Sequence, residues 1–595
     1  MKKEDLIKLK EKLSELSSEE ERLRRLYLRK LSLGEVYGPM VGYASIDKPW
    51  LRCYNEEYFF KECSKMTMYE YLLTQNKNNS NMIALNYFGN KILFKQLFKN
   101  INIAYQKYAN LGIKKDDTVS ICGVCTPEVV YTIYALNKLG VRINMIDPRS
   151  SSEVILEYIK MSHSNNLIII DKLSHLVDGF DKKVKLNNIV ELSVADSLPL
   201  PLRLAAGFKQ KKNSGILNYK DIEIVTKYVD NVESYKDDEA VIVYTGGTTG
   251  KPKGVILTND NFNNMSFQYG YSNFGVDKGQ KFLDIITPTF AYGICNSLHL
   301  PLTLGMEVII IPVFDPKKFG YYLNRYKPNH TLGVPKYWED LLDDKTVSKK
   351  NLSYLYSAGC GGAPMSIDKE KEIDSFLKKH GSPSKVAKGY GMTELSSAVV
   401  VCNKSANEFG SVGVPMINSM LSIVDPDTND ELGYNEIGEI CLSSPTLMKE
   451  YLNNPSETDE LISYGNDGIR WAHTGDLGYV DEQGNLFIKD RIKRIIFKRG
   501  IKVYPIEIEN VISKHPAVKN CCVVAASDEC WVEVPIAYIE LREECVGDKD
   551  AIFEEIKELC TKELKAYSVP HQFIMTEIPL TKMGKNDYKK LERKI

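Results

Sequence analysis

The residues best suited to chemistry form a loop rich in glycine and threonine, directly after a strongly apolar segment at 240–244. Glycines let the backbone approach a ligand closely, and successive backbone N–H groups can then surround an anion. The threonine hydroxyls and two lysines add hydrogen-bond donors and positive charge. We therefore predict a polyphosphate-binding loop, with a solvated hairpin loop as the alternative. Its residues are Thr245, Gly246, Gly247, Thr248, Thr249, Gly250 and Lys251.

This loop departs from the P-loop of nucleoside triphosphatases. The P-loop has four residues between its first glycine and a Gly-Lys pair, and Ser or Thr follows the lysine. Here Pro252 follows Lys251, and Thr245 stands where that first glycine would be. The loop is therefore interpreted from its own residues.

A second short segment, residues 390–394, ends in the carboxylate Glu394. A carboxylate beside a polyphosphate is repelled unless a hard cation lies between them, and carboxylate oxygens are ligands that Mg²⁺ accepts. We therefore predict that Glu394 binds Mg²⁺ next to the phosphates. An ordinary surface carboxylate is the alternative.

Two further segments carry residues that suit a nucleotide. Residues 357–364 are almost all small and follow a predicted strand, so flat groups could lie against their backbone; a tight turn before a helix is the alternative. In residues 471–476, Asp476 offers a carboxylate with several acceptor lone pairs for sugar hydroxyls. We interpret His473 in the same segment as structural rather than catalytic.

In this order, the motifs resemble those of the adenylate-forming superfamily, which includes acyl-CoA synthetases, peptide-synthetase adenylation domains and beetle luciferases. The resemblance spans about residues 68–590 and is closest to the AMP-forming acyl-CoA synthetases. It implies that Tyr390 lies against adenine, that Thr393 contacts the α-phosphate and that Asp476 binds ribose. With the loop residues above, the implied ATP- and AMP-binding residues are Gly361, Gly362, Ala363, Tyr390, Gly391, Thr393, Asp476 and Arg491.

The C-terminal motifs resemble the moving parts of the same superfamily. Residues 490–494 are similar to its hinge, which assigns Asp490 and Lys493 to the pivot. Residues 579–585 are similar to its terminal signature, which implies that Lys585 is catalytic together with Thr393 and Glu394; Lys582 is the nearest competitor. We expect the C-terminal unit to rotate between the two half-reactions so that Lys585 can leave the site.

The resemblance also assigns an acyl pocket to Phe290, Ala291, Tyr292 and Gly359. Ala291 stands where enzymes that adenylate α-amino acids usually carry an aspartate, so an amino acid substrate is disfavoured. The histidine that many acyl-CoA synthetases have in segment 288–293 is missing. Phe497 replaces the lysine that luciferases use in their second half-reaction. The aromatic and apolar character of this segment favours a fatty or aryl acid, and Phe497 disfavours an oxygenase step.

The implied reaction is ATP-dependent formation of an acyl-AMP with release of pyrophosphate, followed by transfer of the acyl group to coenzyme A. ATP, Mg²⁺ and CoA are thus the expected cofactor and cosubstrates. Two alternatives remain open. One is a ligase that loads the phosphopantetheine of an acyl carrier protein, and the other is an inactive adenylate-binding regulatory module.

Alternating apolar runs and helical periodicities predict the elements that carry these motifs. Helices are expected at 94–111 and 128–139, and buried strands at 118–122, 167–170, 240–244 and 307–311. This alternation predicts an α/β fold with a large N-terminal domain of mainly parallel sheets covered by helices. Short strands follow residue 410, and a small mobile α+β C-terminal domain follows Asp490. The expected divisions are a helical N-terminal extension (1–60), an AMP-binding domain (61–490) and a C-terminal domain (491–595).

Composition and charge narrow the possible partners and cellular locations of the protein. The formal net charge of −1 over 595 residues gives no overall basic field for nucleic acid. The 13 scattered cysteines, with no leader pattern at Met1, favour free thiols in the cytoplasm, and we interpret Cys122 and Cys125 as two buried thiols. No run of about 18 apolar residues suggests a membrane span. Leucines at helical spacing near the start predict a helix on the main body, with peripheral membrane or partner contact as the alternative.

Overall fold

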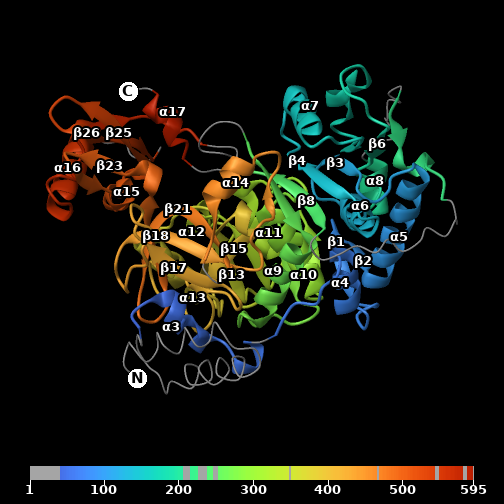
Figure 1. The fold of residues 1–595 in the computed structure, drawn as a ribbon, viewed down its shortest axis with the longest axis horizontal. Helices are drawn as coiled ribbons and strands as arrows, with labels where there is room; N and C mark the ends of the chain where they lie inside the picture. Colours follow the sequence, from blue (N-terminus) through green and yellow to red (C-terminus); the bar gives the residue numbers. More distant parts are fainter. Residues whose placement is uncertain are drawn as a thin grey trace.

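The fold is given by a computed structural model, which describes residues 41–59, 61–205, 215–224, 238–245, 252–347, 350–465, 468–542, 549–580 and 586–593. These residues form four β-sheets with helices on their faces (Figure 1). None of the described helices combines the length and the apolar character that crossing a membrane requires. The leucine-rich helix expected before residue 41 lies outside the described residues.

The first sheet has eight strands and carries the start of the polyphosphate-loop motif. Its order is β19-β9-β8-β4-β3-β5-β6-β7, and the pairs from β8 to β7 are parallel, whereas β9 is antiparallel to β8 and to β19. The strands are β3 (Thr118–Cys122), β4 (Arg142–Ile146), β5 (Asn166–Ile170), β6 (Asn188–Leu192), β7 (Leu217–Asn218), β8 (Glu239–Tyr244), β9 (Gly254–Thr258) and β19 (Glu450–Tyr451).

The second sheet has nine strands in the order β16-β15-β14-β13-β12-β10-β11-β1-β2. Neighbours from β14 to β1 are parallel, and both edges are antiparallel. The strands are β1 (Ile83–Tyr87), β2 (Asn90–Leu93), β10 (Lys281–Asp284), β11 (Glu307–Ile310), β12 (His330–Gly333), β13 (Ser357–Gly361), β14 (Val386–Met392), β15 (Ser397–Val401) and β16 (Val414–Pro415).

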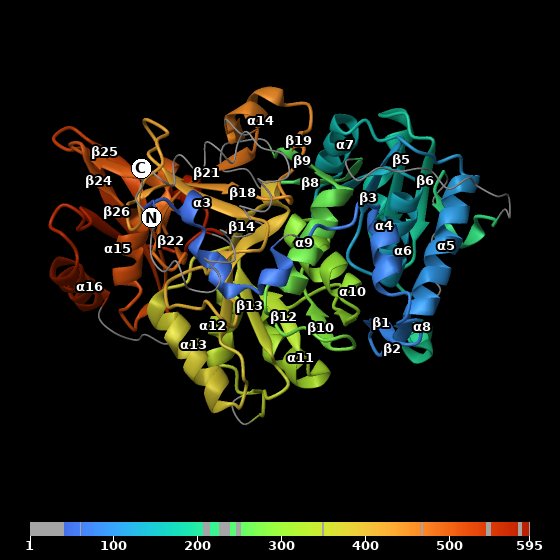
Figure 2. The same ribbon diagram turned by 60° about the horizontal axis from the view of Figure 1, so that its bottom comes forward.

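Two smaller sheets of five strands follow along the chain. The third is antiparallel and contains β17 (Met420–Val424), β18 (Gly438–Ser443), β20 (Ile462–Tyr464), β21 (Arg470–Val480) and β22 (Leu486–Arg491). The fourth contains β23 (Ile496–Lys498), β24 (Ile501–Val503), β25 (Val518–Asp528), β26 (Val532–Leu541) and β27 (Gln572–Met575), of which β27 is parallel to β26. In both Figure 1 and Figure 2 the fourth sheet lies beside the third, at one end of the molecule.

Helices cover the two large sheets, and they begin and end at residues that explain their limits. In α6 (Pro127–Lys138), Thr126 caps the N-terminus and Pro127 occupies the first turn, while Gly140 follows the end with a φ of 71°. The other α-helices of the described chain are α3 (Ala44–Asp47), α4 (Met68–Gln75), α5 (Phe94–Asn110), α7 (Ser152–Met161), α8 (Leu200–Ala205), α9 (Asn259–Tyr271), α10 (Leu300–Thr303), α11 (Phe319–Tyr326), α12 (Pro335–Leu342), α13 (Ile367–Lys379), α14 (Pro455–Leu461), α15 (Pro505–Ile512), α16 (Lys549–Glu563) and α17 (Tyr588–Glu592).

The predicted α/β fold is confirmed, because both large sheets are mainly parallel and helices cover them. The strand at 118–122 matches β3, and the other predicted elements agree with α5, α6, β5, β8 and β11 within a residue or two. Cys122 and Cys125 are free and buried, as interpreted. The division of the chain into 1–60, 61–490 and 491–595 stays a prediction.

The segment before α4 is more deeply packed than its composition suggested. Trp50 is fully buried in the main core, and a Cβ built on Gly484 would lie 2.8 Å from the Trp50 backbone nitrogen. Asp47 is also buried, and its carboxylate accepts a hydrogen bond from the Tyr434 hydroxyl. Residues 41–59 thus pack against the large body.

Candidate active site

The polyphosphate-loop motif joins two antiparallel strands, β8 and β9, at the antiparallel side of the first sheet. The backbone N–H of Thr245 donates to the carbonyl of Lys253 at 3.0 Å and continues the pairing of Tyr244 with Gly254. The Tyr244 ring stacks on Tyr158 with centroids 3.8 Å apart, which fixes the strand end. Gly246, Gly247, Thr248, Thr249, Gly250 and Lys251 lie outside the described residues.

Three side chains predicted for adenine and ribose converge at the meeting of the second and third sheets. The Tyr390 hydroxyl, from β14, donates to Asp476 Oδ2 at 2.7 Å. Arg491 forms an ion pair with Asp476, with Nε 3.0 Å from Oδ1. We call Tyr390, Asp476 and Arg491 the ribose cluster. The structure therefore brings together residues that lie up to 101 positions apart in the chain.

The backbone around the ribose cluster explains its geometry. Asp476 in β21 and Arg491 in β22 are paired across the two strands, so their side chains share one face. Gly391 has no room for a side chain, because a Cβ there would lie 1.8 Å from the carbonyl oxygen of Ser397. Burial and the neighbouring Asp476 charge raise the pKa of Tyr390 well above its usual value, while Asp476 raises the pKa of Arg491. The tyrosine is thus a proton donor and the arginine a permanent cation.

Glu394, the predicted Mg²⁺ ligand, follows β14 in the 3₁₀ turn η8 (Thr393–Leu395) and is buried. The hydroxyl of Tyr451 donates to Glu394 Oε1 at 2.5 Å. Burial raises the pKa of Glu394, so its carboxylate form needs a compensating positive charge. Lys253 Nζ lies 4.8 Å from the centre of the Tyr451 ring and pairs with Glu457. Lys253 therefore lies close enough to Glu394 for its positive charge to favour the carboxylate form.

The predicted acyl-pocket residues lie on two neighbouring elements. Ala291 is buried just before the π-helix η6 (Tyr292–His299), and the Tyr292 hydroxyl donates to the carbonyl of Gly333 at 3.3 Å. Phe290 stands 5.8 Å from the Arg149 guanidinium. These contacts form an aromatic wall at the end of β12.

The small-residue segment lies across from that wall, at the end of β13. A Cβ built on Gly361 would lie 3.7 Å from the Tyr292 hydroxyl, and Gly362 has a φ of 85°. Ala363 is exposed directly after them. Gly359 lies deeper, because its Cβ position is 2.4 Å from Leu332 Cδ2 and its carbonyl accepts from the Trp338 indole. Gly361 to Ala363 therefore lie at the more exposed end of this segment, and Gly359 packs behind them.

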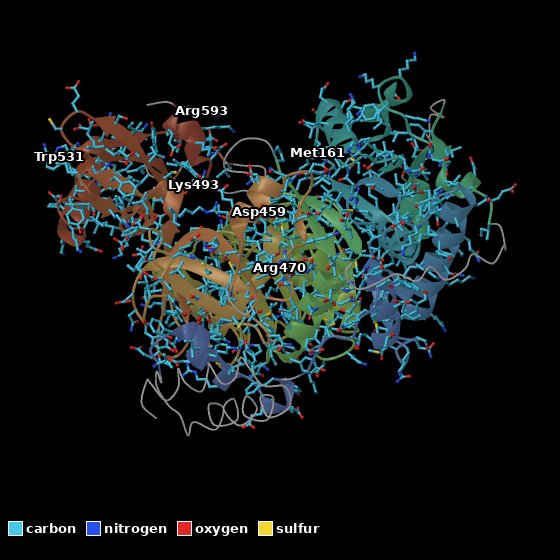
Figure 3. All side chains as sticks on the ribbon, in the orientation of Figure 1. Met161, Asp459, Arg470, Lys493, Trp531 and Arg593 are labelled. Carbon is cyan, nitrogen blue, oxygen red and sulfur yellow. The ribbon has the colours of Figure 1, made fainter. Side chains whose placement is uncertain are left out.

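The predicted hinge is held from the C-terminal side. Asp490 is buried, its Oδ2 accepts the backbone N–H of Ile506 at 2.8 Å, and Arg494 lies 3.6 Å from its Oδ1. Arg494 also pairs with Glu509 at 2.5 Å. Lys493, in the 3₁₀ turn η9 (Ile492–Arg494), is exposed between the large body and the C-terminal unit (Figure 3).

Other predicted residues stay predictions on sequence alone. Lys582 and Lys585 lie outside the described residues. Thr393 begins η8, next to Glu394, which suits the predicted phosphate contact without testing it. The sequence reasoning missed Tyr451 because its partner Glu394 is 57 positions away, and no local pattern marks such a pair.

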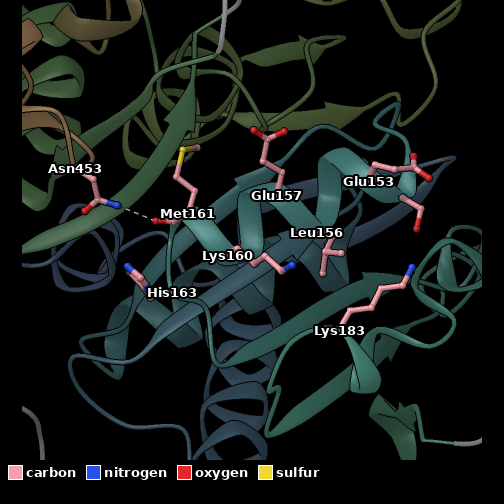
Figure 4. A pocket seen from close by; sticks show the side chains of 9 residues that line it. Glu153, Leu156, Glu157, Lys160, Met161, His163, Lys183 and Asn453 are labelled. Carbon is pink, nitrogen blue, oxygen red and sulfur yellow. Dashed lines mark hydrogen bonds between the residues drawn. The ribbon is translucent and has the colours of Figure 1, made fainter.

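A pocket of about 670 Å³ includes none of the predicted site residues in its lining (Figure 4). It runs along α7 and is lined by Glu157, Lys160 and His163, and the Asn453 amide donates to the carbonyl of Met161 at its rim. Its mixed charges and open form do not match the predicted nucleotide motifs. The ribose cluster, rather than this groove, is the candidate site.

Two family descriptions match the chain. One, "AMP-binding enzyme", matches residues 72–452, and the other, "AMP-binding enzyme C-terminal domain", matches residues 507–585. A 4-coumarate:CoA ligase 1 of Petunia hybrida is 28% identical over 488 residues, covering 80% of this chain and 84% of the relative. A long-chain-fatty-acid–CoA ligase of Bacillus subtilis (strain 168) is 27% identical over 565 residues, covering 90% and 96%.

Solved structures have the same fold. An anthranilate CoA ligase in complex with anthranoyl-AMP aligns with a TM-score of 0.77 and 21% identity over 89% of this chain and 97% of that chain. The o-succinylbenzoate CoA synthetase of Bacillus subtilis, in complex with its acyl-adenylate intermediate, aligns with a TM-score of 0.73 and 24% identity, covering 89% and 98%. At these identities the likeness concerns the fold.

Proposed function

The chain belongs to the AMP-binding enzyme family, and from this we propose that it activates a carboxylic acid with ATP and transfers the acyl group to coenzyme A. The observation that carries the proposal is the ribose cluster. Asp476 accepts a hydrogen bond from Tyr390, forms an ion pair with Arg491 and is the carboxylate that sugar hydroxyls would meet. The relatives named as CoA ligases support the second step.

In the first half-reaction, a carboxylate oxygen of the acid attacks the α-phosphorus of ATP, and pyrophosphate leaves. Both reactants are anions, so positive charge and hydrogen-bond donors must already be in position. The loop at 245–251, Thr393 and Lys585 are the proposed donors. Arg491 and Tyr390 hold Asp476 in place for the ribose, which orients the α-phosphate.

Glu394 suits a hard divalent cation. It is a buried oxygen donor whose pKa is raised by burial, so a nearby positive charge would stabilise its ionised form. Mg²⁺ bound there would neutralise phosphate charge during the attack. The Tyr451 hydroxyl orients the carboxylate through Oε1.

In the second half-reaction, the thiol sulfur of CoA attacks the acyl carbonyl, and the thiol proton and AMP leave. A lysine that covers this carbonyl during adenylation has to move away before the thiol arrives. We assign that movement to rotation of the C-terminal unit near Asp490 and Lys493. The exposed position of Lys493 between the two bodies supports this assignment (Figure 3).

The proposed substrate is a fatty or aryl acid. Phe290 and Tyr292 supply aromatic surface, and Gly361 and Gly362 leave room for a flat or extended group. Ala291 is buried and apolar and cannot pair with a substrate ammonium group. The relatives are named for both 4-coumarate and long-chain fatty acids, so the range of the acid is a matter for experiment.

The test is pyrophosphate release by the full chain with ATP, Mg²⁺ and a panel of aryl and fatty acids. Each acid is assayed with free CoA and with a phosphopantetheine-bearing carrier protein as acceptors. We expect release that depends on the acid and an acyl-CoA product. Turnover with the carrier alone would replace CoA as the acceptor. Failure of every acid to release pyrophosphate, while the Tyr390–Asp476 site still binds ATP, would overturn the enzymatic proposal in favour of an inactive binding module.

A further inference from the structure

Three metal-ligating side chains meet beside the ribose cluster and have no part in the reaction described above. They are Glu439 and Cys441 of β18 and His473 of β21. His473 Nδ1 lies 3.0 Å from Glu439 Oε2 and 3.4 Å from Cys441 Sγ, and the three ligand atoms all lie within 4.8 Å of one another. We call them the Glu-Cys-His cluster.

The strand pairing explains why these side chains meet. Cys441 is the direct cross-strand partner of His473, and Glu439, two residues earlier, shares the same face of β18. The register of the β18–β21 pair shifts between Glu439 and Cys441, a bulge that turns the Glu439 side chain toward His473. Gly475, with a φ of 69°, lies in the same distorted part of β21.

Two contacts of this cluster share one nitrogen atom, Nδ1 of His473. Nδ1 of His473 carries either one proton or one lone pair. It can therefore donate to Glu439 or accept from Cys441, but it cannot do both at once. A cation at the point where the three atoms converge would satisfy all of them at once.

The distances fit a tetrahedral transition-metal ion. Bonds of ~2.1 Å from Zn²⁺ to nitrogen or oxygen and ~2.3 Å to sulfur separate neighbouring ligand atoms by roughly 3.4–3.6 Å. The observed 3.0 and 3.4 Å need only small shifts to reach these values. The other atoms of the ligands are also held, as in metal sites: Ser463 Oγ lies 3.0 Å from His473 Nε2, and the Gly475 N–H donates to Glu439 Oε1.

We propose that Glu439, Cys441 and His473 bind a divalent transition-metal ion of the zinc class. Thiolate and imidazole ligands select zinc-like ions over Mg²⁺ and Ca²⁺. The thiol proton passes to solvent on binding, so a thiolate and a carboxylate balance the two positive charges. The side chains of His473 and Glu439 keep 21% and 13% of their surface exposed, which leaves a path for the ion and a fourth position for water.

The metal would cross-link β18 and β21 at a point three residues before Asp476, the carboxylate of the ribose cluster. His473 is three residues from Asp476, and Glu439 holds the Gly475 N–H between them. The bound metal would therefore hold β21, the strand that contains Asp476, without contacting the nucleotide. Its expected effects are one bound ion per chain and a higher unfolding temperature when the ion is present.

The experiment is a titration of the chelator-treated full chain with Co²⁺. The background carries Cys530→Ser and Cys545→Ser, because Cys530 is an exposed thiol and Cys545 lies outside the described residues. We expect one Co²⁺ per chain, with a near-ultraviolet thiolate-to-cobalt absorption band that Zn²⁺ displaces. Cys441→Ser on this background should lose the band, whereas the background alone should keep it.

Two further variants keep the proposal testable if Cys441→Ser fails to fold. Glu439→Gln and His473→Gln should each weaken Co²⁺ binding at least tenfold, and each should lose the rise in unfolding temperature that Zn²⁺ gives the background protein. The proposal is overturned if the background protein shows no thiolate-to-cobalt band. It is equally overturned if Cys441→Ser keeps the band, or if Zn²⁺ stabilises the background and both glutamine variants alike.

Discussion

Asp476 and Asp490 occupy neighbouring positions in one strand pair, yet their side chains contact different parts of the chain. In the β21–β22 ladder Asp476 pairs with Arg491, and Leu477 pairs with Asp490. Asp476 faces Tyr390 of the second sheet, whereas Asp490 accepts from Ile506 of the C-terminal unit. Successive side chains of a strand point to opposite faces, so the β21–β22 pair separates the ribose cluster from the contact with the C-terminal unit, which we call the joint.

The surroundings of the two aspartates differ as their assigned roles require. Arg491, the partner of Asp476, keeps 48% of its side chain exposed, so a ligand can reach it. The Asp490 side chain is 1% exposed, and burial raises its pKa. The Asp476 side chain is 11% exposed and lies beside this accessible arginine, whereas Asp490 is enclosed and holds two parts of the chain together. Four substitutions test this division.

The largest loss of activity is expected from a substitution near the C-terminus, beyond the joint. Lys585→Ala should lower the rate of adenylate formation by ~10²–10³, because it removes a charge that stabilises the attack of one anion on another. It should still convert a presynthesised acyl-AMP and CoA to acyl-CoA. Each half-reaction is measured separately, with Lys582→Ala as the matched control. Equal loss of both half-reactions would refute rotation of the C-terminal unit.

Next in size is Asp476→Asn on the ligand side. Hydrogen bonds to charged groups contribute about 1.5–3 kcal/mol, so the KM for ATP should rise by roughly 10- to 100-fold. The control is Asp459→Asn, an exposed carboxylate on α14, which should change KM less than about twofold. Initial rates at varied ATP provide the measurement. An unchanged KM would remove Asp476 from the ribose site.

On the joint side, Asp490→Asn should change a different parameter. The amide still accepts from Ile506 but loses the charge that faces Arg494. We expect about a tenfold lower kcat for the complete reaction, which is ~1.4 kcal/mol, with a KM for ATP within about twofold of the wild type. Glu507→Gln, an exposed carboxylate at the same joint, serves as the control. A rise in KM as large as that of Asp476→Asn would erase the distinction between the two aspartates.

Tyr390→Phe should have the smallest effect. It removes one neutral hydroxyl that donates to Asp476 and leaves Arg491 in place. The lost bond ends on a carboxylate that Arg491 still holds and does not reach the nucleotide itself, so the affinity for AMP should fall by roughly two- to tenfold. Calorimetric titration with AMP measures the change. Binding lost altogether would mean that the ring, rather than its hydroxyl, was displaced by the substitution.

Much of this arrangement follows from local sequence. Buried apolar runs predicted β3, β5 and β8 because strands covered on both faces need continuous apolar residues. The adenine and ribose motifs each lie within a few residues, so their resemblance to a family could be recognised. Their convergence at Asp476 came from the family pattern and not from spacing, since Tyr390 and Arg491 are distant in the chain.

The parts that the sequence did not predict are contacts between distant residues. Tyr451 reaches Glu394 across 57 positions, and the backbone of Ile506 meets Asp490. No pattern in the sequence marked Trp50 as a residue buried in the main core. Such contacts depend on how the folded sheets pack against one another, and short sequence patterns do not predict that packing.

The most direct test of the account is ATP–pyrophosphate exchange without CoA. Labelled pyrophosphate should enter ATP only when a suitable acid is present, because the acyl-AMP forms and reverts at the site that Asp476 organises. Wild type and Asp490→Asn should both exchange, whereas Asp476→Asn should need far more ATP. Exchange that does not depend on any carboxylic acid, or is absent with every acid tested, would contradict carboxylate activation by this chain.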